Sequence, residues 1–126
     1  MTDDKSRLDK GLEMFREVYG NQVPVPEGAE KSPFHSLMLE NLFGQVWGRE
    51  AMSVRDRRLI LMGVIAGVGA DMMLLEIQLK SALEKGELQR DQLREIPIIL
   101  TQYIGYPKTV PVMFAVEKVL AATADN

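Results

Sequence analysis

The sequence has no cysteine and a single histidine among its 126 residues. Without cysteine there is no disulfide, no thiolate nucleophile and no thiolate ligand for a metal. The lone histidine, His35, excludes a two-histidine metal site within one chain. We therefore expect neither a metal nor another cofactor. The absence of cysteine also fits a reducing compartment.

Long apolar runs and an excess of basic charge are missing as well. The longest apolar run, residues 59–70, is far shorter than the ~20 residues of a membrane-spanning helix. The N-terminal residues, Met1-Thr2-Asp3-Asp4, are acidic and polar, unlike a secretory signal. The net charge of −3 disfavours nucleic acid, which would call for a basic stripe. We expect a cytoplasmic protein with neither a membrane nor a nucleic-acid partner.

Apolar residues at helical spacing are what the chain does contain. Residues 8, 12, 15 and 18 form the first apolar face. Helix starts are indicated by Ser32 before Pro33, Ser53, Asp71 and Asp91, and helix ends by glycines such as Gly86. The turn Gly105-Tyr106-Pro107 precedes a last helix expected from about residue 109 to 122. With 46% hydrophobic and 26% charged residues, the pattern predicts one all-α domain over residues 1–126. The predicted domain has about six helices.

The third expected helix is unusual because residues 59–68 are apolar on every side. A helix that is apolar all round is buried all round. In so small a domain, this predicts that part of the helix faces another subunit.

Gln78 lies on the inward stripe of the helix that Asp71 begins, four residues after Leu74 and four before Ala82. A buried glutamine needs hydrogen-bond partners, because an unpaired polar group costs about 1–3 kcal/mol. Two interpretations stay open. Gln78 is either a satisfied core or interface residue, or a residue that lines a pocket.

Basic side chains near the second and third helices are candidates for binding a carboxylate. Arg49 could do so with two parallel hydrogen bonds. Among Arg55, Arg57 and Arg58, we expect one to form a structural ion pair and one or two to be solvated.

Three further side chains are candidates for the site. His35 is either a surface histidine or a catalytic one, and its place in the first turn of a helix favours the neutral imidazole. Trp47 is either a core residue or a platform for a ligand. Tyr103, before the turn that precedes the last helix, has a hydroxyl that could reach a pocket.

Four segments in order resemble the carboxymuconolactone decarboxylase family. The stretches FGQVWGR (43–49) and MSVRDR (52–57) resemble its "FG-x-VW-x-R…LS-x-R-x-R" pattern. ALEKG (82–86) resembles its "A-L-x-x-G" helix end, and YIGYP (103–107) its "Y-x-G-x-P" turn. The resemblance covers about residues 8–120. It implies the all-helical alkyl hydroperoxidase D-like fold and assembly as a homo-oligomer, a trimer or hexamer.

Two departures from the family pattern bear on activity. The peroxidase branch uses Cys-x-x-Cys with a nearby histidine, but the matching segment here is DMML (71–74). Cysteine-dependent peroxidase activity is therefore chemically excluded. The decarboxylase branch carries a histidine on its fourth helix, in an "E-L-x-x-H" context, where this chain has Gln78.

Decarboxylation of a carboxylated lactone leaves a dienolate, so a site must stabilise an oxyanion and then deliver a proton. Glutamine can donate a hydrogen bond but cannot supply a proton near neutral pH. Tyr103, His35 or water would have to protonate instead. Because a general acid contributes ~10²–10⁴-fold, we expect the family's standard reaction to be slow or absent.

Three hypotheses follow. The first is a carboxy-lyase for a small carboxylated lactone or related acid, as in the catabolism of aromatic compounds. Gln78 would stabilise charge, and Trp47 and Arg49 or Arg55 would bind the substrate. The second is a non-catalytic oligomeric member that binds a small molecule or a protein partner. The third is a purely structural helical oligomer.

Overall fold

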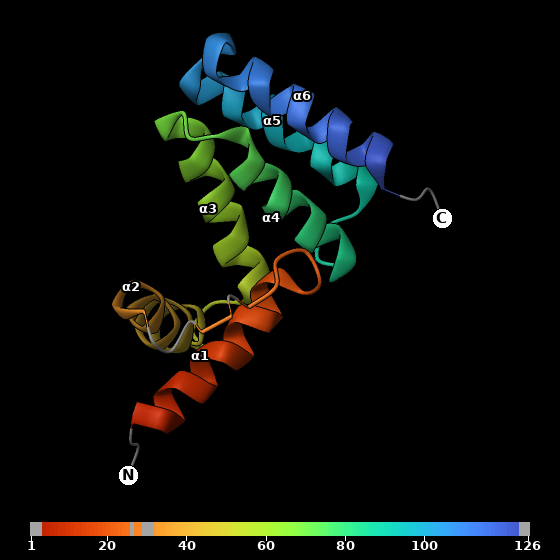
Figure 1. Cartoon of the computed structure of the whole chain (residues 1–126). Helices are drawn as coiled ribbons and strands as arrows, with labels where there is room; N and C mark the ends of the chain where they lie inside the picture. The colour runs from red at the N-terminus through yellow and green to blue at the C-terminus, as the bar shows by residue number, and fades with distance from the viewer. Residues whose placement is uncertain (1–3, 26, 29–31, 124–126) are drawn as a thin grey trace. The chain divides into compact units, whose positions relative to one another are not determined.

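The structure, a computed structural model, describes residues 4–25, 27–28 and 32–123, with side chains from Arg7 onward. It forms two compact units, residues 1–57 and 58–126. Every element in the described ranges is a helix, so the predicted all-α fold is confirmed there (Figure 1). Within these ranges, no helix has the length and apolar character needed to cross a membrane.

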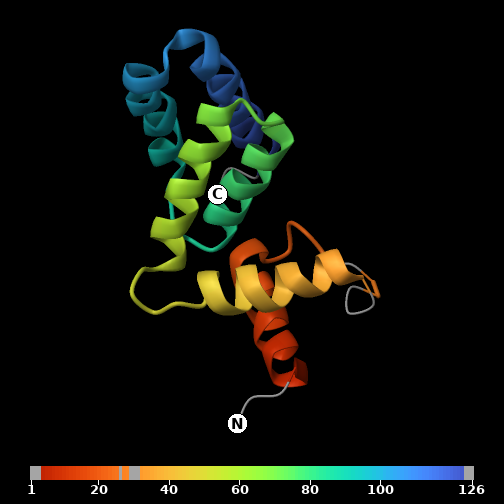
Figure 2. The same ribbon diagram turned by 90° about the vertical axis from the view of Figure 1, so that its left-hand side faces the viewer.

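The first unit is built from α1 (Asp4–Tyr19), α2 (Pro33–Leu37) and the π-helix η2 (Met38–Trp47). α2 begins as the sequence predicts, because the Ser32 hydroxyl accepts a hydrogen bond from the His35 N–H at 3.5 Å. The chain then continues directly into η2, which crosses α1 in the views of Figures 1 and 2. The ring of Phe43 packs edge-on against Phe15 at 5.0 Å and gives this unit an aromatic core.

Gly11 allows α1 and η2 to approach closely. A Cβ atom at this position would overlap the carbonyl oxygen of Leu39, which is a backbone atom of η2. No side chain can therefore be placed at Gly11 without moving one helix away from the other.

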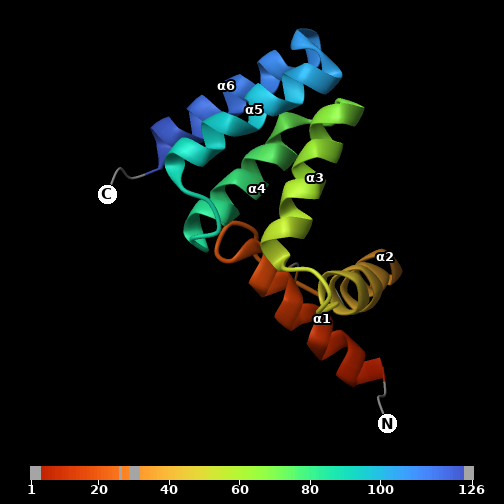
Figure 3. The same ribbon diagram turned by 180° about the vertical axis from the view of Figure 1, so that it is seen from behind.

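The second unit contains most of α3 (Val54–Val68), together with α4 (Met72–Glu84), α5 (Arg90–Ile104) and α6 (Tyr106–Ala122). α5 and α6 lie side by side, and α4 packs against α6 (Figure 3). The buried core of this unit draws on all four helices through Met62, Leu75, Leu79, Leu93, Val112 and Val116.

Predicted caps of α3 and α4 are confirmed. The Ser53 hydroxyl accepts from the Asp56 N–H at 3.0 Å, and the Asp71 carboxylate accepts from the Met73 N–H at 2.8 Å. Gly86 ends α4 with a φ of 71°, in the left-handed region that favours glycine.

Two predicted boundaries are wrong. The N-cap of α5 is Gln89 rather than Asp91, because the Gln89 and Gln92 side chains bond each other's backbone N–H groups. The last helix begins at Tyr106 rather than near residue 109, because proline suits a helix's first turn and Pro107 lies there. Only Gly105, with a φ of 85°, separates α5 from α6.

One side of α3 stays exposed although its residues are apolar. Ile60, Val64 and Val68 are exposed, while Met62, Ile65 and Ala66 are buried. A single chain therefore does not cover α3 on all sides. Its contact with another subunit remains a prediction.

Candidate functional site

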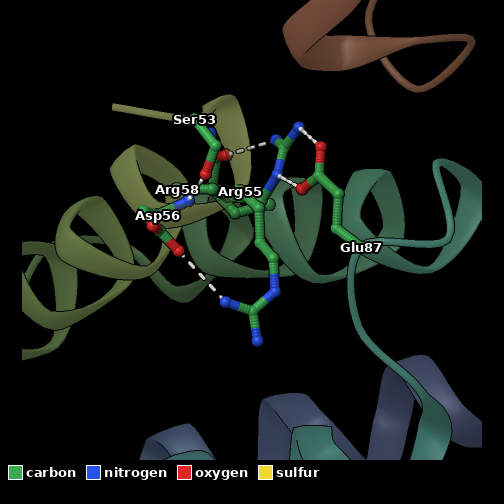
Figure 4. A network of polar contacts seen from close by, with 6 residues as sticks. Ser53, Arg55, Asp56, Arg58 and Glu87 are labelled. Carbon is green, nitrogen blue, oxygen red and sulfur yellow. Dashed lines mark hydrogen bonds and ion pairs between the residues drawn. The ribbon is translucent and has the colours of Figure 1, made fainter. Parts of the chain in front are cut away.

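Arg58 lies at the centre of a buried polar network in the second unit. Its Nε donates to Glu87 Oε1 at 2.6 Å, and its Nη2 donates to Glu87 Oε2 at 3.1 Å (Figure 4). Its Nη1 donates to Gln78 Oε1 at 2.9 Å. The Arg58 side chain is 1% exposed and that of Glu87 is 13% exposed. All three guanidinium nitrogens are therefore bonded to side chains of the same unit.

The end of α4 places Glu87 opposite Arg58. The Gly86 N–H bonds the Leu83 carbonyl at 3.1 Å, and the Glu87 N–H bonds the Ala82 carbonyl at 2.9 Å. These two bonds, with Gly86 in the left-handed conformation, make a Schellman motif, a common way for a helix to end. The motif turns the chain sharply back, so that the residue after the glycine packs against the helix it has just left.

Gln78 sits in the middle of α4, beside the buried Leu75 and Leu79. It is 3% exposed, which confirms its predicted place on the inward stripe. The sequence left two interpretations of Gln78 open, a satisfied core residue or a residue that lines a pocket. Its oxygen agrees with the first, because it accepts a hydrogen bond from Arg58.

The contact with Arg58 also fixes which way the Gln78 amide points. An arginine side chain can only donate hydrogen bonds, so the atom facing Nη1 must be the amide oxygen. Among the described residues, the Gln78 nitrogen has no hydrogen-bond acceptor. In the same part of the chain, the fully buried side-chain atoms without a partner are Arg57 Nε and Thr101 Oγ1, so the Gln78 nitrogen retains contact with solvent. The N–H₂ group is thus a donor that has no acceptor among the described residues.

The network accounts for the expected structural ion pair among the arginines of α3. Arg58 forms it, whereas Arg55 forms an exposed pair with Asp56 at 3.0 Å (Figure 4). Arg57 donates instead to the Arg49 carbonyl at 3.0 Å. Because Glu87 neutralises Arg58, the buried site carries little net charge.

The remaining predicted site residues before position 58 belong to the first unit. Trp47 is buried and stacks on Phe43 with ring centroids 6.4 Å apart, as a core residue would. His35 is partly buried, with its ring edge-on to Phe34. Arg55 is partly exposed beside Asp56.

Arg49 lines a surface hollow of about 360 Å³ in the first unit. Arg7 and Lys10 from α1 and the acidic Glu40 from η2 also line it. Three cations and one carboxylate give this hollow a positive balance. That is the character expected of a site for an anion.

Tyr103, on α5, is 84% exposed. Its neighbour Tyr106 lines a groove of about 320 Å³ between α5 and α6, together with Thr101 and Met113. A third hollow of about 320 Å³ lies between α4 and α6. Over the described residues, none of these hollows is lined by Gln78. No cluster of three His, Asp or Glu side chains able to hold a metal occurs in the described part of the chain.

Sequence reasoning missed Glu87 and did not connect Arg58 with Gln78. One signal was present: Gly86, recognised as a helix-ending glycine, is followed directly by an acidic residue. A Schellman turn returns that residue toward the helix. An acid there, with a buried arginine in reach, would have suggested the pair.

Comparison with known proteins finds a similarity to a decarboxylase. No protein-family model matches the chain. The chain is similar to the nitrosuccinic acid decarboxylase npaB of Metarhizium robertsii, at 24% identity over 123 residues. The match covers 94% of this chain and 85% of that protein, so it extends over both units.

Proposed function

We propose that this protein is a carboxy-lyase of the carboxymuconolactone decarboxylase type, acting on a small carboxylic acid. The observation that carries the proposal is the Gln78 amide, whose oxygen is held by Arg58 and whose N–H₂ group remains a donor. The similarity to a decarboxylase over 94% of the chain supports the same class. No cofactor enters the proposed reaction.

The proposed reaction needs one strong donor near a developing oxyanion. The bond between the carboxylate and the neighbouring carbon breaks, carbon dioxide leaves, and the electron pair moves through that carbon onto a conjugated oxygen. The Gln78 N–H stabilises this oxygen. A proton then adds to a carbon of the resulting conjugated anion. Arg58 cannot release a proton near neutral pH, so the proton comes from water or from Tyr103 or His35.

Two substrates meet this chemical requirement. In 4-carboxymuconolactone, the electron pair reaches the lactone carbonyl. In nitrosuccinic acid, which the relative's name specifies, it reaches the nitro group. Both are small polycarboxylates or carboxylated lactones with an oxygen as the electron sink.

Within the first unit, the proposed carboxylate-binding residue is Arg49 or Arg55, with Trp47 nearby in the sequence. Arg49 is the better supported of the two, because Arg7 and Lys10 line the same hollow. Arg55 already has Asp56 as a partner at 3.0 Å. A guanidinium that must first release a carboxylate binds a second one more weakly.

A non-catalytic binding protein is the second candidate. The observation that favours it is the low exposure of Gln78, which is 3%, together with its absence from the three hollows. In this case the Arg58–Gln78–Glu87 network is a structural core element. A ligand would bind without turnover.

The deciding experiment is turnover of 4-carboxymuconolactone and nitrosuccinic acid by wild type, Gln78→Glu and Gln78→Ala. Gln78→Glu keeps an oxygen for Arg58 but removes the donor and adds a negative charge. We expect kcat to fall by about 10²–10³-fold, as on loss of an oxyanion donor. Gln102→Glu, the same change on the exposed face of α5, is the control and should keep wild-type activity.

The outcomes separate the two candidates. Turnover that Gln78→Glu abolishes and Gln102→Glu preserves supports the carboxy-lyase. A wild type that binds either acid in calorimetry without releasing carbon dioxide supports the binding protein. A Gln78→Glu variant as active as wild type would exclude Gln78 as the donor.

We also propose that the chain assembles as a homo-oligomer, a trimer or hexamer. Apolar side chains that single chains seldom leave exposed support this, namely Ile60, Val64 and Val68 of α3. Light scattering coupled to size-exclusion chromatography measures the mass directly. A monomer at micromolar concentration would contradict the proposal.

A further inference from the structure

We propose that Arg58, locked by Glu87, is a positioning residue that holds the Gln78 amide in the one orientation able to donate to a developing oxyanion. This inference rests on the proposed function of Gln78. It assigns to Arg58 no contact with the substrate. Arg58 acts through the glutamine.

The need for such a residue comes from the symmetry of the amide. The last torsion of a glutamine side chain is broad and roughly two-fold, so its oxygen and nitrogen exchange places at little cost. A histidine ring has a similar two-fold torsion, but turning it exchanges a nitrogen with a carbon rather than a donor with an acceptor. A glutamine in the histidine's place needs an outside group to select one orientation.

Arg58 supplies that selection. Its Nη1 lies 2.9 Å from Gln78 Oε1, and a turned amide would bring two donors face to face. Because the guanidinium is 1% exposed, water cannot relieve that repulsion. The charged donor on the oxygen also polarises the amide, which strengthens its N–H as a hydrogen-bond donor.

Glu87 in turn fixes Arg58. Its two oxygens accept from Nε and Nη2 at 2.6 and 3.1 Å, which sets the plane of the guanidinium. A lysine at position 58 has no planar fork and cannot satisfy both partners in this way. The carboxylate also cancels the buried charge. Polarisation of Gln78 therefore comes without a free cation that would bind the substrate's carboxylate in the wrong place.

The first arm of the test measures the orientation of the amide without any reaction. The Gln78 side-chain N–H₂ signals in a ¹⁵N spectrum are identified by their loss in Gln78→Glu, and their ¹⁵N relaxation gives an order parameter. The double variant Arg58→Met/Glu87→Met removes the lock and takes away both charges of the ion pair together, so it is expected to fold. The control is Arg94→Met/Glu117→Met, which removes the exposed pair that joins α5 and α6.

We expect the Gln78 order parameter to be near the rigid value of about 0.85 in wild type and in the control. In Arg58→Met/Glu87→Met it should fall below about 0.6, with the backbone spectrum otherwise native. An unchanged order parameter in this folded variant would overturn the proposal.

The second arm measures turnover. In Arg58→Met/Glu87→Met, kcat should fall by about 10-fold or more, toward the loss seen when an oxyanion donor is removed. KM should stay close to wild type, because Arg58 does not touch the substrate. Arg58→Lys should recover little of the loss. A rise in KM at unchanged kcat would overturn the positioning role.

The two arms keep this inference apart from the proposed function. If wild type turns over neither acid, the proposed function fails, and the order parameter alone decides whether Arg58 positions the amide. If wild type is active and the order parameter does not move, the carboxy-lyase stands and the positioning role falls.

Discussion

Replacing Arg58 by methionine measures how strongly the second unit depends on its buried ion pair. The substitution keeps an unbranched side chain of similar length, so α3 and the nearby packing are disturbed little. It removes the two Arg58 hydrogen bonds from the Glu87 carboxylate, which is 13% exposed, and it leaves the Gln78 oxygen without its donor. Removing one partner of a buried ion pair typically costs about 3–5 kcal/mol. That is a large part of the roughly 5–15 kcal/mol by which whole domains are stable.

A double-mutant cycle separates the pair from its surroundings. Glu87→Met alone removes the carboxylate that pairs with the Arg58 guanidinium. It should lower the free energy of unfolding by a similar amount, about 3–5 kcal/mol. The double variant removes both charges of the pair and leaves the Gln78 oxygen unpaired, at about 1–3 kcal/mol. The loss in the double variant should therefore be smaller than the sum of the single losses by at least about 2 kcal/mol.

Urea unfolding of the full chain, followed by circular dichroism, supplies the four free energies. The same cycle on the exposed Arg94–Glu117 pair, whose Arg94 Nε and Glu117 Oε2 atoms lie 2.9 Å apart, is the matched control and should show much weaker coupling. A double variant whose loss equals the sum of its parts would refute the view that Arg58 and Glu87 stabilise the fold through each other.

Three further outcomes are expected. Gly86→Ala should lower the free energy of unfolding by about 1–2 kcal/mol through its positive φ alone, since a Cβ there has open space, and chemical denaturation measures it. Gly11→Ala should destabilise the first unit by more than this, because the Cβ meets the Leu39 backbone; a lower midpoint in Trp47 fluorescence would show it, and an unchanged one would contradict the close approach. The hydrogen bond from Arg94 lowers the pKa of Glu117 below its ordinary 4.5. The stability that ionised Glu117 contributes is therefore fully present above about pH 4.5 and is lost as the pH falls through the lowered pKa. Glu117→Gln should remove this part of the acid dependence of the melting temperature, and added salt should weaken it in wild type.

Local signals in the sequence predicted most helix boundaries. Ser32, Ser53 and Asp71 each bond a backbone N–H two or three residues ahead, so their neighbours alone decide whether they cap a helix. The prediction of Asp91 as a cap was wrong because Gln89 caps the helix instead, through reciprocal hydrogen bonds with Gln92. Glutamine is a weaker cap signal than aspartate, so the sequence did not point to Gln89. The apolar residues of η2 are also compatible with an ordinary helix. The sequence therefore did not predict its π-helical hydrogen bonds.

The site was only half predictable for a physical reason. Helical periodicity alone predicted that Gln78 faces inward, because the face on which a side chain lies depends only on its position in its own helix. Its partner Arg58 is 20 residues away in the sequence, and Glu87 is 29 residues from Arg58. Contacts at such separations depend on how three segments pack. Whether Trp47, Arg49, Arg55, Tyr103 and His35 act in the site remains a prediction.

The Schellman turn at Gly86 also constrains the length of α4. Gln78 lies in the middle of α4 and Glu87 lies just beyond its end, and both must meet a single guanidinium. Adding or deleting one residue between them would turn one relative to the other by about 100° around the helix axis. Between these two positions the chain therefore cannot change length, and position 86 must also keep a residue that tolerates a positive φ.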